Sequence, residues 1–124
     1  MAAGRQDKRT LGVTPEGAAL LESIMQTDWF KEEMDAYLVA ISLAFANDLI
    51  AGTEEMVGVT TKWNVGTLDQ DGKLRRMVLA LSSEQVERPY AVTERRAAAG
   101  LGYLKARLVD EHAELSAVLM PEEG

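Results

Sequence analysis

The clearest hydrophobic pattern in the chain is the segment 36–47, AYLVAISLAFAN, its longest stretch without a charged side chain. Its 12 residues fall well short of the ~20 that an α-helix needs to cross a bilayer, so the segment predicts a buried helix in a water-soluble fold. From Ala36 onward the polar face of this helix nearly disappears. We therefore expect the rest of the domain, or a partner subunit, to enclose it on most sides.

Two helices are predicted in the first half of the chain. Thr14-Pro15-Glu16 combines a capping side chain, a proline suited to the first helical position and an acid for the positive end of the dipole, which predicts a helix from Pro15 to near Gln26. Thr27 or Asp28 is expected to cap the second helix. Its apolar positions recur every three or four residues, at Phe30, Met34, Tyr37, Leu38, Ile41 and Phe45.

The middle of the chain changes to a period of two, which is typical of a strand. The alternating positions are Val57, Val59, Thr61, Trp63, Val65 and Thr67. A turn is predicted over 69–72, where Gly72 can adopt positive φ. Residues 73–82 fit both a strand and a helix; helix is favoured because Leu, Arg, Met and Ala are good helix formers.

A long helix is predicted after Arg88-Pro89. A heptad-like seam, interrupted at Glu111, runs through Ala97, Leu101, Leu104, Leu108, Leu115 and Val118. Gly100 and Gly102 each cost about 1 kcal/mol relative to alanine in a helix, so we expect another backbone to approach closely there.

These elements predict one domain over 1–124 that is mainly α with a small β element (α+β). It should contain an N-terminal helical hairpin with a long central buried helix, a short strand and turn region, and a long C-terminal helix. Residues 1–10 and 121–124 are expected to be flexible ends.

Composition removes several classes of function. With 47% hydrophobic residues the chain is not wholly disordered, and with no cysteine it has no disulfide, thiolate zinc site, iron–sulfur cluster or cysteine nucleophile. The first ten residues are polar where a secretory signal needs an apolar block, so a cytoplasmic location is expected and no membrane partner.

Charge is segregated along the sequence. Residues 1–60 hold four basic and ten acidic side chains, a net charge of −6, and residues 110–124 hold five acids and no base. Residues 61–109 hold nine basic and five acidic side chains, a net charge of +4. This pattern is compatible with a head-to-tail contact between subunits, with a basic patch for a polyanion, or with solubility alone.

Candidate chemistry is sparse. The segment TLDQDGKLRRMV resembles a calcium loop, but it places Thr67 and Val78 where the first and last ligands belong, so an ordinary turn is favoured. His112, the only histidine, has no second imidazole or suitably spaced carboxylates nearby, and no glycine-rich phosphate loop is present. No catalytic, metal or cofactor site is predicted; a small enzyme with an unrecognised carboxylate/His site is kept as the second alternative.

The first alternative is a nucleic-acid role. Arg5, Lys8 and Arg9 precede the stretch Thr10-Leu11-Gly12-Val13 and then two helices, and this order resembles the layout of ribbon-helix-helix DNA-binding proteins over about 40 residues. The resemblance implies a dimer that reads DNA with side chains of a paired strand, here Arg9, Thr10 or Gly12. The net charge of −7 disfavours nucleic acid as a partner. The candidate polyanion contacts are Arg9, Arg75, Arg76, Arg95 and Arg96.

The leading hypothesis is a non-enzymatic, small helical interaction module of bacterial type, a self-associating subunit or accessory component of a larger assembly. A homodimer is the first expectation, with a further protein partner also considered. The candidate interface residues are Trp29, Phe30, Tyr37, Leu101, Leu104 and Leu108. Aromatic residues at helical spacing, Tyr90 and Tyr103 among the others, are also typical of a core.

Overall fold

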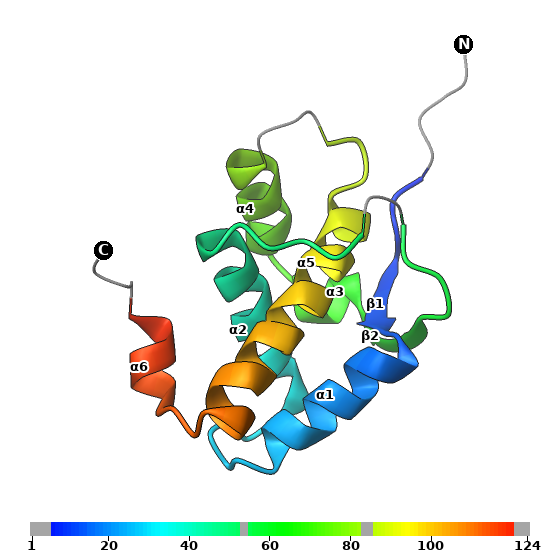
Figure 1. Ribbon diagram of the computed structural model, residues 1–124. Helices are drawn as coiled ribbons and strands as arrows, with labels where there is room; N and C mark the ends of the chain where they lie inside the picture. The colour runs from blue at the N-terminus through cyan, green and yellow to red at the C-terminus, as the bar shows by residue number, and fades with distance from the viewer. Residues whose placement is uncertain (1–5, 53–54, 83–85, 121–124) are drawn as a thin grey trace.

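The computed structural model describes residues 6–52, 55–82 and 86–120, and it confirms a mainly α fold with one small antiparallel sheet (Figure 1). In the described part of the chain, no helix combines the length and apolarity needed to cross a membrane. The elements in order are β1 (Thr10–Val13), α1 (Pro15–Met25), α2 (Glu33–Ala46), β2 (Thr60–Asn64), α3 (Val65–Leu68), α4 (Lys73–Leu81), α5 (Pro89–Lys105), the π-helical turn η1 (Ala106–Asp110) and α6 (Leu115–Leu119).

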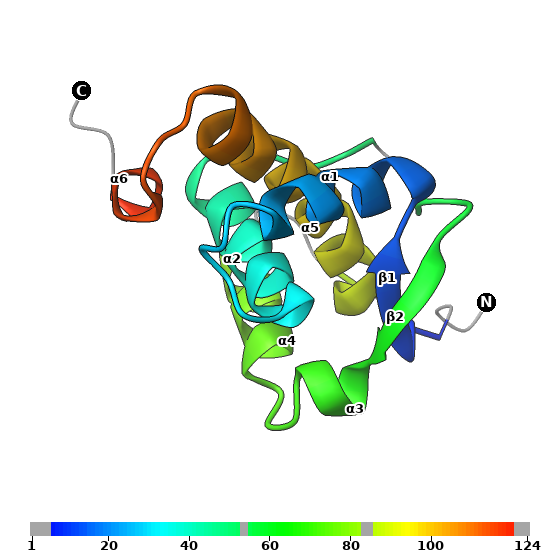
Figure 2. The ribbon, with the colours of Figure 1, turned by 90° about the horizontal axis from the view of Figure 1, so that it is seen from below.

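The core forms where α5 packs against α1 and α2 (Figure 2). Ala36, Ala40 and Ala44 follow one another at intervals of four along α2, and all three are fully buried. Their small side chains let α5 come so close that a Cβ built on Gly100 would lie 1.8 Å from the carbonyl oxygen of Ala40. The predicted close approach at Gly100 is confirmed. At Gly102 a Cβ would meet nothing within 4 Å, so the same expectation is wrong there.

The central helix α2 is enclosed largely as predicted. Six of its residues are buried, while Ser42 and Ala46 are exposed. The enclosing elements belong to the same chain.

The first helix has the predicted bounds, and the second begins later than predicted. The Thr14 hydroxyl accepts a hydrogen bond from the Gly17 N–H (3.1 Å) at the start of α1. The expected cap of α2 at Thr27 or Asp28 is wrong. The Thr27 hydroxyl instead donates to the Ile24 carbonyl (2.6 Å), and Asp28 adopts a positive φ of 61°, so these residues end α1 rather than begin α2.

The sheet is shorter than the predicted strand region. β2 pairs with β1 over 60–64, with Leu11 opposite Trp63. The strand predicted from Val57 to Thr67 is shorter at both ends. Gly58, at φ +72°, interrupts it before β2, and α3 begins at Val65. Of the β2 side chains, Trp63 alone is partly buried, with its ring centroid 4.7 Å from that of Tyr37.

Residues 73–81 form the favoured helix, α4, after the predicted turn. Gly72 has φ +74°. The Asp69 carboxylate accepts the backbone N–H groups of Leu74 (2.9 Å) and Arg75 (3.0 Å), so an acid from the turn caps the helix.

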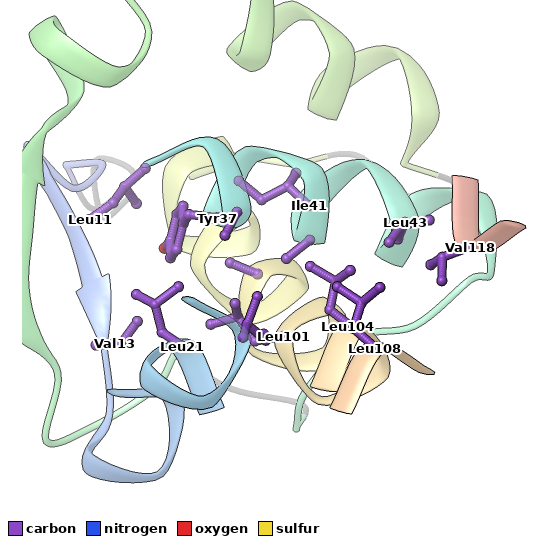
Figure 3. Close-up of a cluster of buried hydrophobic side chains, with 14 of the residues drawn as sticks. Leu11, Val13, Leu21, Tyr37, Ile41, Leu43, Leu101, Leu104, Leu108 and Val118 are labelled. Atoms are coloured by element: carbon purple, nitrogen blue, oxygen red, sulfur yellow. The ribbon is translucent and has the colours of Figure 1, made fainter. Parts of the chain in front are cut away.

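The predicted continuous helix to Val118 is wrong, because the chain turns back after η1. His112 takes a positive φ of 56°, and the Ala113 N–H donates to the Arg107 carbonyl (2.9 Å). The reversal lets α6 bury Val118 beside Leu43 (Figure 3), whereas a straight helix would have carried this apolar side chain past the end of the core.

The expected flexible ends lie partly outside the described residues, which exclude 1–5 and 121–124. Residues 6–10 differ from that expectation because they contact α5. The Asp7 carboxylate accepts the backbone N–H groups of Tyr90 (2.8 Å) and Ala91 (3.2 Å) at the first turn of α5, and Arg88 donates to the Gln6 carbonyl (2.9 Å).

Candidate functional site

Most of the predicted interface residues lie inside the chain's own core. Tyr37, Leu101 and Leu104 are fully buried and Leu108 nearly so, because the heptad-like seam packs within the chain (Figure 3). They are therefore not surface contacts in this fold. Trp29 is 44% exposed in the connection between α1 and α2, and Phe30 beside it is partly buried. Tyr90 and Tyr103 are also partly buried.

Two of the predicted polyanion contacts, Arg95 and Arg96, fasten a loop to α5. The Arg95 guanidinium donates to the carbonyls of Ala51 (3.0 Å) and Gly52. Arg96 donates to the carbonyl of Leu49 (2.9 Å), and its guanidinium also lies over the ring of Phe45. Both arginines therefore bind backbone carbonyls of the chain's own loop.

The other three predicted contacts are exposed and lie in two separate parts of the chain. Arg9 precedes β1, while Arg75 and Arg76 lie in the first turn of α4. The Arg76 guanidinium donates to the Asp71 carbonyl (3.1 Å).

The sheet differs from what the ribbon-helix-helix resemblance implies. β1 pairs with β2 of the same chain, and the N–H of Gly12 donates to a carboxylate of α5. Leu11, Gly12 and Val13 are buried, so of the predicted reading residues only Arg9 is exposed and Thr10 partly so.

A buried carboxylate that the sequence analysis missed joins β1 to the helices. Glu94 of α5 is 2% exposed. One of its oxygens accepts the Gly12 N–H (3.1 Å), and the other lies 2.9 Å from Lys8 Nζ. The Tyr37 hydroxyl donates to the Gly12 carbonyl (3.1 Å), so both backbone polar groups of this glycine are bonded to side chains.

The buried position governs the titration of this cluster. Burial raises the pKa of Glu94, although Lys8 and the Gly12 N–H act in the opposite direction. Burial also raises the pKa of Tyr37 well above its ordinary range, and the nearby Glu94 charge adds to the effect. Through its hydrogen bond to Gly12 and its ion pair with Lys8, Glu94 joins β1 to α5.

One signal in the sequence could have revealed Glu94. It precedes Ala97 by three residues and Leu101 by seven, so it lies on the same helix face as the apolar seam. A charged residue on such a face predicts a buried partner.

A second buried acid, Asp69, ties the turn before α4 to α5. Besides capping α4, it accepts a hydrogen bond from the Tyr90 hydroxyl (2.7 Å). Burial and this hydrogen bond raise the pKa of Tyr90 to about 12.

His112 lies exposed in the turn between η1 and α6. Among residues 6–52, 55–82 and 86–120, no three His, Asp or Glu side chains form a group that could hold a metal ion.

The apolar surface offers binding features instead. A groove of about 350 Å³ lies between α2, α5 and α6. It is lined by Leu43, Ala46, Asn47, Tyr103, Val118, Leu119 and Met120. On α4, Leu79 is 38% and Leu81 57% exposed.

Comparison of the chain with protein-family models, with curated proteins and with solved structures found no match.

Proposed function

We propose that the protein is a non-enzymatic helical interaction module, which self-associates in the cytoplasm as a subunit or accessory component of a larger assembly. The observation that carries the proposal is the exposure of large apolar side chains at three places: Trp29, Leu79 with Leu81, and the groove that Leu119 and Met120 border. Adjoining apolar side chains at a surface mark interaction sites, and Leu119 and Met120 adjoin at the groove.

The contacts of the two buried acids favour an interaction module over an enzyme. General acid–base catalysis needs a titratable group that can reach a substrate. Glu94 and Asp69 are both buried. Glu94 accepts the Gly12 N–H and forms an ion pair with Lys8, and Asp69 accepts backbone N–H groups with both of its oxygens.

The nucleic-acid alternative has less support. Arg95 and Arg96 bind backbone carbonyls, and β1 pairs within its own chain. Phosphate contacts require accessible Lys and Arg side chains, and the chain carries a net charge of −7. We expect the protein to pass through a heparin column at low salt; retention that falls with added salt would favour the alternative.

Light scattering across a wide concentration range tests self-association directly. The expected result is a mass at least twice that of one chain, rising with protein concentration because association follows mass action. A strict monomer at the highest concentration would overturn the proposed function.

A further inference from the structure

Helix α4 carries charges that its own folding does not favour. Lys73, Arg75 and Arg76 all lie in its first turn and are all exposed, and this turn contains no acid. The N-terminus of a helix is the positive end of its dipole, where cations are unfavourable. Asp69 and Asp71 of the preceding turn offset part of this repulsion. The Arg76 guanidinium also donates to the Asp71 carbonyl (3.1 Å), so the preceding turn neutralises these cations only in part.

The same helix leaves apolar side chains at the surface. α4 packs against α5 and fully buries one residue, Val78. Arg75 and Leu79 are four residues apart, so they adjoin on one helix face. We call Arg75, Arg76 and Leu79 the α4 surface; it pairs two cations with a leucine that is 38% exposed.

The connection between α1 and α2 has the opposite character. Asp28 and Glu32 are exposed there, as is Asp35 in the first turn of α2, and Trp29 in the connection is 44% exposed. We call Asp28, Trp29, Glu32 and Asp35 the Trp29 surface. Lys31, also exposed, is a cation within this segment, which nevertheless keeps an excess of acids.

The two surfaces lie at opposite ends of the molecule. In Figure 1, α4 is at the top and the connection between α1 and α2 is at the bottom. The α4 surface of one chain therefore cannot reach the Trp29 surface of the same chain, but it can meet that of another copy.

We propose that the α4 surface binds the Trp29 surface of a second copy of this chain, in a head-to-tail contact that rests on the proposed self-association. Arginine is suited to both components of this partner, because its guanidinium pairs with carboxylates and stacks on the face of Trp. Leu79 adds apolar area next to the indole. Each copy keeps one surface unused, so the contact repeats into open chains or closes into a ring.

Two charge-reversal variants test this arrangement. Arg75→Glu/Arg76→Glu disables the α4 surface, and Glu32→Lys/Asp35→Lys, at two exposed positions, disables the Trp29 surface. We expect each variant alone to be monomeric in light scattering. An equimolar mixture should associate again, because it holds one intact pair of surfaces and the two reversed surfaces are also opposite in charge. The wild-type protein should form larger species that shrink as salt is added.

A matched control separates location from net charge. Glu16→Lys/Glu22→Lys changes the net charge as much as the Trp29-surface variant does, but on exposed positions of α1. It should associate like the wild-type protein. Circular dichroism of every variant verifies folding, which these exposed substitutions should preserve.

The outcomes distinguish the two proposals. A monomeric wild-type protein would overturn the proposed function. Self-association that survives both charge reversals would overturn the head-to-tail contact alone. Loss of association in the α4 variant but not in the Trp29 variant would indicate a symmetric α4 contact, which also contradicts it. Two monomeric variants that do not associate on mixing would also contradict the head-to-tail contact.

Discussion

Replacing Gly100 by alanine tests the closest packing in the fold. The new Cβ would lie 1.8 Å from the Ala40 carbonyl oxygen and 2.4 Å from its carbonyl carbon. Carbon–oxygen contacts normally begin at about 3.3 Å, so α2 and α5 would have to separate by roughly 1.5 Å. The obstacle is backbone, which cannot rotate away as a side chain can.

The expected loss of stability follows from two opposing contributions. Overpacking a core costs about 1–3 kcal/mol, and a backbone clash belongs at the upper end of that range. Alanine in place of glycine stabilises a helix by about 1 kcal/mol. Gly100→Ala should therefore lower the free energy of unfolding by about 2 kcal/mol, which corresponds to a fall in Tm of roughly 8 °C.

Gly102→Ala is the matched control, two residues further along the same helix. A Cβ there meets nothing within 4 Å, so only the gain in helix propensity remains. This variant should be more stable than the wild-type protein by up to about 1 kcal/mol. Urea unfolding followed by far-UV circular dichroism measures both changes as shifts of the midpoint at unchanged slope. If Gly100→Ala proved as stable as the wild-type protein, the inferred contact between α2 and α5 would be wrong.

Further predictions concern the two buried acids. Glu94→Ala leaves the Gly12 N–H without its acceptor and should lower the free energy of unfolding by about 2 kcal/mol, while Glu94→Gln, which keeps an acceptor, should cost less in urea unfolding. Because the pKa of Glu94 is raised above its ordinary 4.5, the folded state binds its proton more readily than the unfolded state. Relative to Glu94→Gln, wild-type stability should therefore increase as pH falls through the folded pKa towards 4.5; the opposite slope would contradict the effect of burial. Asp69→Ala removes the cap of α4 and should cost about 2 kcal/mol. In an absorbance titration the same change should lower the pKa of Tyr90 from about 12, and an unchanged value would refute the role given to the hydrogen bond between them.

Helices and turns that depend on residues close by in the sequence were predictable. Thr14 and Pro15 define the start of α1 because capping and the fixed φ of proline act within a few residues. The turn at 69–72 and the helix α4 likewise follow from Gly72 and the propensities of their neighbours. The uncharged segment 36–47 correctly indicated a helix enclosed on most sides.

The candidate surfaces were predictable only in part. Trp29, Arg75 and Arg76 were singled out by residue type and are exposed, whereas Leu101, Leu104 and Leu108 were singled out by periodicity and are core. A heptad-like spacing shows that a helix has an apolar face. It does not show whether that face meets its own chain or another.

By itself, the sequence determined that α1, α2, α4 and α5 are helices and where their main apolar faces lie, because these depend on neighbours within one or two turns. Only the tertiary structure decided that Glu94 bonds to Gly12, 82 residues away, and that Arg95 and Arg96 hold a loop to α5. The tertiary structure also decided that the chain reverses after η1, so that Val118 packs beside Leu43. Buried polar groups and apolar side chains must find partners in three dimensions, and those partners lie at sequence separations that no local pattern encodes.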